Sequence, residues 1–138
     1  GTLGEALRFM ENILGVHPGE INKVDFYTSH EALLLHYEEA QTRQVPRRPG
    51  WFNLSTHFPW IGVRTADPAG AHVEYFRGIA NPIGVKIGPA MGRDQILRLI
   101  DILHPVNEPG RLTFIHRFGL ERIADSLPRL VEIVRSSG

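Results

Sequence analysis

The sequence predicts an α/β fold of four βα units with parallel strands, resembling half of a (β/α)8 barrel. Short runs rich in β-branched and aromatic residues alternate with longer amphipathic runs, which favours parallel βαβ units. The length of 138 residues suits one domain, whereas an eight-unit barrel typically needs around 250 residues. We therefore expect a single βα-repeat domain over residues 1–138. An open four-stranded layer is the other geometry that this pattern allows.

The composition excludes several classes of protein. Lys plus Arg and Asp plus Glu number 15 each, so no basic field favours nucleic acid or an anionic membrane surface. The absence of cysteine excludes disulfides and thiolate metal sites. No apolar run approaches the roughly 18 residues of a membrane span, and no signal-peptide pattern opens the chain. We expect a cytoplasmic protein without nucleic-acid or membrane partners.

The amino-terminal segment, residues 1–21, is predicted to hold a leading helix and its connection. The helix spans 2–14, where Thr2 and Glu5 fit a capping box and apolar residues recur at helical spacing. Gly15 and Pro18 are typical of a helix end.

The first βα unit is predicted from Val24 onward. Val24–Tyr27 is the strand, and Ser29 caps the helix that follows. Three consecutive leucines, 33–35, indicate that this helix is buried over a wide arc. Its solvated face is predicted to carry Glu38, Glu39 and Arg43.

The second unit begins with a strand at Trp51–Ser55, followed by a long connection and a helix at Ala71–Ile79. The third strand is Ile83–Ile87, and its helix spans Gly92–Leu103. The remaining elements are a strand at Leu112–His116 and a closing helix at Leu120–Val134, within which Pro128 predicts a kink.

Three cations are predicted at the ends of three successive strands or in the turn that follows. Arg64 follows the second strand and its turn, Lys86 lies near the end of the third strand, and Arg117 follows the fourth. Ligands of βα folds bind at the carboxyl ends of strands, so these side chains should meet there. Arginine grips carboxylate or phosphate with two hydrogen bonds, and lysine acts as a point charge. The pattern predicts one site for a phosphorylated, anionic small molecule.

Polar and aromatic side chains are predicted to reach the same edge. His57 and His116 should form hydrogen bonds beside the anion site, whereas Trp60 is equally suited to a pocket wall and to core packing. The first strand is expected to deliver its final residues to this edge as well, namely Tyr27, Thr28, Ser29 and His30.

The seven histidines do not form a recognisable metal site. His30 and His36 are too far apart to share a helix face, and the His-Glu-x-x-His pattern is absent. Neither Ser29 nor Ser55 lies in a Gly-x-Ser-x-Gly elbow, which argues against a hydrolase triad. No Gly-rich phosphate loop of dinucleotide-binding or P-loop type occurs.

Several motifs resemble the class II (plant-type) 3-deoxy-D-arabino-heptulosonate 7-phosphate (DAHP) synthases. One contains the run Thr-Ser-His-Glu-Ala-Leu, a second reads Trp-Ile-Gly-x-Arg-Thr, and a third reads Asn-Pro-Ile-Gly-Val-Lys-Ile-Gly-Pro. The matching stretches are 25–35, 60–65, 70–74, 81–89 and 107–113.

The resemblance implies condensation of phosphoenolpyruvate with erythrose 4-phosphate, the first step of the shikimate pathway that supplies aromatic amino acids. It implies a (β/α)8 barrel and a divalent metal of manganese or cobalt type in the full-length enzyme. Arg64, Lys86 and Arg117 match the family's phosphate- and carboxylate-binding cations, with Lys86 as the catalytic residue. Trp60 and His57 complete the predicted substrate site.

The sequence departs from the family pattern in ways that bear on activity. Val63 stands where the family has Glu or Asp, and Ala66 stands where it has a second arginine. The family's Cys, His, Glu and Asp metal ligands have no counterparts, so we expect no metal bound by this chain alone and no synthase activity from it.

Two explanations of this partial match stay open, a fragment of a larger enzyme and a shortened, non-catalytic homologue. The homologue would bind phosphorylated metabolites or a partner protein. A half-barrel has open strand edges, and its strands are rich in apolar residues, so its uncovered face should be strongly apolar. We expect a homo-oligomer, favouring a dimer over a monomer whose helices repack over that face.

Overall fold

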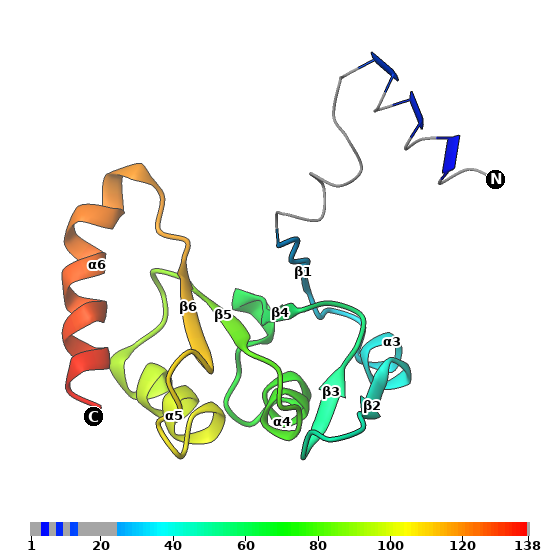
Figure 1. Cartoon of the computed structure of the whole chain (residues 1–138). Coiled ribbons are helices and arrows are strands. Elements are labelled where there is room, and N and C mark those ends of the chain that lie inside the picture. Colours follow the sequence, from blue (N-terminus) through cyan, green and yellow to red (C-terminus); the bar gives the residue numbers. More distant parts are fainter. Residues whose placement is uncertain (1–3, 6–7, 10–11, 14–24, 138) are drawn as a thin grey trace.

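The computed structural model describes residues 4–5, 8–9, 12–13 and 25–137. Its main feature is a four-stranded parallel sheet with the order β1-β4-β5-β6 (Figure 1). This arrangement confirms the predicted α/β fold and is consistent with half of a (β/α)8 barrel. The predicted helix over 2–14 and its capping pair fall largely outside the described residues. The strands are β1 (Ser29–Glu31), β4 (Phe58–Ile61), β5 (Ile83–Ile87) and β6 (Leu112–His116).

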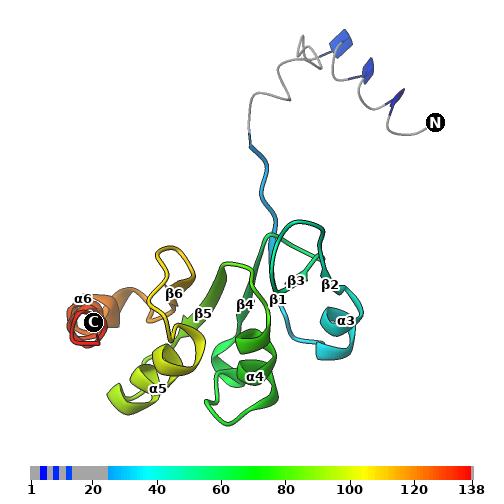
Figure 2. The same ribbon diagram turned by 60° about the horizontal axis from the view of Figure 1, so that its bottom comes forward.

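Helices alternate with these strands, and α4 and α5 lie side by side along one face of the sheet (Figure 2). The last three helices agree with the predicted ranges to within a residue at each end. Pro128 lies inside α6, and the helix continues past it to Arg135. The helices are α3 (Leu35–Ala40), α4 (Ala71–Gly78), α5 (Arg93–Leu103) and α6 (Leu120–Arg135), with a 3-10 turn η1 (Val63–Thr65) after β4.

The prediction that the second strand pairs within the parallel sheet was wrong. Residues Trp51–Asn53 form β3, which pairs antiparallel with β2 (Thr42–Gln44) outside the main sheet. The second parallel strand is β4, in the stretch predicted as a connection. Its Pro59 argues against a strand, because proline cannot donate to the ladder. The ladder tolerates it because the flanking residues form the bonds to β1, and pairing with β5 begins only at Trp60.

The first βα unit was also misplaced. The strand is β1, several residues after the predicted Val24–Tyr27, and Ser29 begins this strand instead of capping a helix. The helix α3 starts only at Leu35. Leu33 and Leu34 are 48% and 71% exposed, which contradicts the expected burial over a wide arc.

The two faces of the sheet differ in chemistry. On the face that the helices cover, Ile61, Ile83, Val85 and Ile87 are at most 1% exposed and belong to the core. The alternate residues form the inner face, where the strand register places Glu31 beside Trp60 and Lys86 beside Ile115. The expectation of a strongly apolar uncovered face was therefore wrong. The inner face is mixed and consists of Ser29, Glu31, Phe58, Trp60, Gly84, Lys86, Thr113 and Ile115.

A buried carboxylate joins the first unit to the antiparallel pair. Glu38, predicted to be solvated, is only 2% exposed. Its carboxylate accepts hydrogen bonds from Asn53 Nδ2 at 2.6 Å and Ser55 Oγ at 3.0 Å, and lies 2.8 Å from His30 Nε2. The Tyr75 hydroxyl accepts from Asn53 Nδ2 at 3.0 Å, and burial raises the pKa of that phenol. Because a buried charge without partners is costly, these contacts explain how the chain tolerates Glu38 in its interior.

Candidate functional site

A pocket of about 290 Å³ lies at the carboxyl ends of the parallel strands. The three predicted cations, Arg64, Lys86 and Arg117, all line it. This volume is near the lower limit of small-molecule sites, which suits a metabolite of a few carbon atoms. We call it the strand-end pocket; its residues are Glu31, Gly62, Val63, Arg64, Lys86, Gly88, Pro89 and Arg117.

Each cation reaches the pocket from a different element. Lys86 lies on the inner face one residue before the end of β5. Arg64 lies in η1, the turn that directly follows β4. Arg117 follows β6, and its backbone amide donates to the Ile87 carbonyl at 2.9 Å, which continues the parallel ladder. The parallel topology therefore brings together residues that are 22 and 31 positions apart, from 64 to 86 and from 86 to 117.

The Lys86 ammonium is placed by two neighbours. Its Nζ lies 4.8 Å from the centroid of the Trp60 ring, within the range of a cation–π contact. It also lies 4.0 Å from a carboxylate oxygen of Glu31. Both the Lys86 and Glu31 side chains are part-exposed, at 25% and 30%. Trp60 therefore contacts a pocket residue from the inner face, although it does not itself line the pocket.

Sequence reasoning missed Glu31 as a pocket residue. The sequence interpretation assigned it to a helix, and only the later start of β1 places it at a strand end on the inner face. The signal available was the polar run Thr-Ser-His-Glu directly before an apolar stretch. In a strand ending at Glu31, that run would place its last side chain at the carboxyl edge.

His57 does not join the strand-end pocket. It precedes β4 and therefore lies at the amino edge of the sheet, opposite the cations. Its Nδ1 accepts a hydrogen bond from the Thr28 amide at 3.1 Å, and its ring meets Tyr27 edge-on. Tyr27 and Thr28 likewise precede β1, so the expectation that they reach the carboxyl edge was wrong.

Ser29 begins β1 and therefore also lies at the amino edge. The other two residues predicted beside the site, His30 and His116, do not line the strand-end pocket. His30 lies on the opposite face of β1 from Glu31 and contacts Glu38. His116 ends β6, where it is exposed and stacks on the Phe118 ring at 5.8 Å between centroids.

Val63 gives the pocket an apolar wall at the position where the resemblance leads one to expect an acid. A Cβ on Gly88 would lie only 3.1 Å from Val63 Cγ1, so the valine packs directly on this glycine. The carboxylate that lines the strand-end pocket is that of Glu31, which lies in the matching stretch 25–35.

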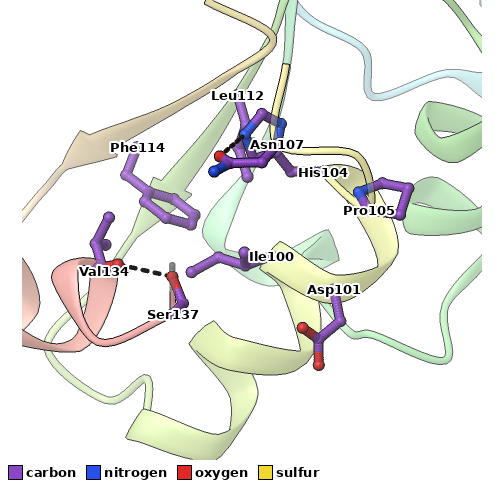
Figure 3. Close-up of a pocket in the computed structure, with 9 residues that line it drawn as sticks. All are labelled: Ile100, Asp101, His104, Pro105, Asn107, Leu112, Phe114, Val134 and Ser137. Atoms are coloured by element: carbon purple, nitrogen blue, oxygen red, sulfur yellow. Dashed lines mark hydrogen bonds between the residues drawn. The ribbon is translucent and has the colours of Figure 1, made fainter. Parts of the chain in front are cut away.

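A second cavity of about 370 Å³ lies near the start of β6, between the carboxyl ends of α5 and α6 (Figure 3). His104 and Asn107 form a hydrogen bond of 2.9 Å on one side, and Phe114 lies on another. None of the three predicted cations lines this cavity, so it does not share the chemistry of the strand-end pocket.

Metal ligands do not cluster in the part of the chain that the structure describes. Among residues 4–5, 8–9, 12–13 and 25–137, no three His, Cys, Asp or Glu side chains lie close enough to hold a metal ion. Within the same ranges, no helix is both long and apolar enough to cross a membrane.

The chain is similar to one family of known proteins. A model of the class-II DAHP synthetase family matches residues 1–138. The phospho-2-dehydro-3-deoxyheptonate aldolase of Streptomyces coelicolor is 47% identical over 136 residues, covering 99% of this chain and 30% of that protein. The enzyme of the same name from Neurospora crassa is 44% identical over 147 residues, covering 96% of this chain and 31% of that protein.

A plant relative extends the comparison. A probable chloroplastic phospho-2-dehydro-3-deoxyheptonate aldolase from Catharanthus roseus is 44% identical over 135 residues, covering 97% of this chain and 27% of that protein. The chain therefore spans less than a third of the length of these relatives. With the family model matched along its whole length, the chain belongs to the class-II DAHP synthetase family.

Proposed function

We propose that this chain supplies part of the phosphate- and carboxylate-binding site of a DAHP synthase. The reaction would be the condensation of phosphoenolpyruvate with erythrose 4-phosphate. The observation that carries the proposal is the convergence of Arg64, Lys86 and Arg117 in one pocket.

The charges of the pocket suit phosphoenolpyruvate. This molecule carries a phosphate and a carboxylate on a three-carbon frame, so it needs several cations within a small space. Two guanidinium groups can each form paired hydrogen bonds to such groups, and the Lys86 ammonium adds a point charge. The pocket keeps a net positive charge with Glu31 included, since its one carboxylate faces three cations. The pocket therefore favours an anion with more than one charged group.

The family is metal-dependent, and in such reactions the metal polarises the aldehyde oxygen. The described residues do not provide a ligand set for that ion. We therefore assign to this chain only the binding and orientation of the anionic groups.

Lys86→Ala is expected to weaken phosphoenolpyruvate binding at least about tenfold, because hydrogen bonds to charged groups contribute about 1.5–3 kcal/mol. Isothermal titration calorimetry on the full chain measures the dissociation constant. Arg77→Ala is the matched control, since it removes an exposed cation that is paired with Glu74 on α4, away from the pocket. Equal affinity of the parent chain and Lys86→Ala, or no binding by either, would contradict the proposed function.

A further inference from the structure

Gly62 provides the space in which the Glu31 carboxylate lies. A Cβ on Gly62 would lie 2.9 Å from the Glu31 carboxyl carbon and would overlap one of its oxygens. The Gly62 backbone has φ −72° and ψ 160°, a conformation open to any residue. A side chain at this position would therefore meet no backbone strain, and it would instead push the flexible Glu31 carboxylate out of its present place. Gly62, directly after β4, and Glu31, at the end of β1, are therefore in close contact across the strand ends.

The same carboxylate faces Lys86. One Glu31 oxygen lies against Gly62, while the other lies 4.0 Å from Lys86 Nζ. This separation is too long for a hydrogen bond, so the ammonium is attracted to Glu31 without donating to it. On its other side the ammonium lies over the Trp60 ring. The three donors of Lys86 are thus held near the pocket without a close hydrogen bond to Glu31.

We propose that Glu31 is a positioning residue, which holds the Lys86 ammonium over Trp60 in the orientation that binds the ligand's anionic group. The inference rests on the proposed function, because it concerns the same pocket. A lysine has four rotatable side-chain bonds, and fixing them costs up to about 2 kcal/mol of conformational entropy. The carboxylate and the indole ring restrict those bonds before the ligand arrives, so less entropy is lost on binding.

If Glu31 positions Lys86, its removal changes anion affinity in the direction opposite to the removal of a simple counter-charge. Removing a negative charge from a cationic pocket strengthens anion binding if Coulomb attraction is all that changes. If Glu31 instead positions Lys86, its removal frees the ammonium and weakens binding. The sign of the change in affinity therefore separates the two roles.

The first test needs no ligand. In a Trp51→Phe background, Trp60 is the remaining tryptophan, and its fluorescence reports on the ammonium over its ring. Lys86→Ala should change the emission of Trp60, and Glu31→Ala should change it in the same direction. If Glu31→Ala emits like the parent while Lys86→Ala does not, Glu31 does not hold the ammonium. If Lys86→Ala also emits like the parent, the ammonium is not over Trp60, and the proposal fails as well.

The second test is a double-mutant cycle in which calorimetry measures the affinity of each variant for phosphoenolpyruvate. Glu31→Ala and Gly62→Ala are each expected to weaken binding about tenfold. The double variant should bind no more weakly than Glu31→Ala, because the methyl group at position 62 then meets no carboxylate. Thermal unfolding of each variant identifies any loss of affinity that comes from loss of folding. Additive losses, or tighter binding by Glu31→Ala, would overturn the proposal.

The outcomes separate this inference from the proposed function. If Lys86→Ala loses affinity while Glu31→Ala and Gly62→Ala bind like the parent, the result supports the anion site and contradicts the positioning role of Glu31. If the parent chain does not bind phosphoenolpyruvate, the proposed function falls, and the fluorescence of Trp60 still decides whether Glu31 places Lys86.

Discussion

Glu38→Ala is expected to lower the free energy of unfolding by about 2–3 kcal/mol, because it removes the shared acceptor of a buried hydrogen-bond network. The lost carboxylate is 2% exposed and accepts hydrogen bonds from Asn53 and Ser55. In the variant Asn53 Nδ2, Ser55 Oγ and the His30 ring each lose this acceptor, while Asn53 Nδ2 keeps the Tyr75 hydroxyl and Ser55 Oγ keeps Asn53 Oδ1. Urea denaturation followed by circular dichroism measures the change.

Glu39→Ala is the matched control, because Glu39 is the next residue on α3 and is exposed. It should change the unfolding free energy by less than about 0.5 kcal/mol. Glu38→Gln keeps an acceptor oxygen and should fall between the two. An effect of Glu38→Ala as small as that of Glu39→Ala would show that the network does not stabilise the fold.

Gly84→Val is expected to destabilise the chain by about 1–3 kcal/mol and to weaken phosphoenolpyruvate binding in the same variant. A Cβ at this position would lie 2.9 Å from Ile115 Cδ1 and 3.0 Å from both Phe58 Cζ and Trp60 Cβ. The neighbouring strands β4 and β6 contribute these atoms, so the new side chain has to displace at least one of them. Because Trp60 supports the Lys86 ammonium, its displacement disturbs the cation as well.

The control for Gly84→Val is Gly78→Val, at the last residue of α4, where a Cβ would meet no heavy atom within 4 Å. Unfolding free energy and binding affinity are measured on both variants. The packing of the inner face would be shown to be irrelevant to the site if Gly84→Val retained the parent's affinity despite lower stability.

The second half of the fold could be predicted from the sequence because its signals agree at every level. β5 is an apolar run that ends before Gly88 and Pro89, and β6 follows the turn at Pro109 and Gly110; the ranges predicted for both are the ranges found. The helix α5 carries an apolar stripe that packs into the core through Ile96, Leu99 and Leu103. Where local propensity and tertiary packing favour the same structure, sequence patterns are reliable.

The first half could not be predicted because tertiary contacts override local signals there. Pro59 argues against a strand, yet it occupies a position in β4 where its missing donor is not needed. The leucines at 33 and 34 suggest a buried helix, yet they lie in the exposed segment before α3. Glu38 has the sequence appearance of a surface residue, and only the donors of β3 and its loop make its burial possible.

The candidate site was predictable to the extent that it depends on parallel topology. Lys86 and Arg117 were identified from their positions at the ends of strands that the structure contains. Arg64 was assigned to the end of a strand that lies outside the parallel sheet, yet it follows β4 and lines the same pocket. His57 was placed wrongly because the strand it was thought to follow lies elsewhere, and it precedes β4 instead. Glu31 was missed because the start of β1 was misplaced. Errors in strand boundaries therefore became errors in the site.

A crystal structure of the full chain with phosphoenolpyruvate tests the strand-end pocket as the anion site most directly. We predict the ligand in this pocket, with its anionic groups within hydrogen-bond distance of Lys86 Nζ and of the Arg64 and Arg117 guanidinium groups. Phosphoenolpyruvate in the cavity beside His104, or bound away from all three cations, would contradict it.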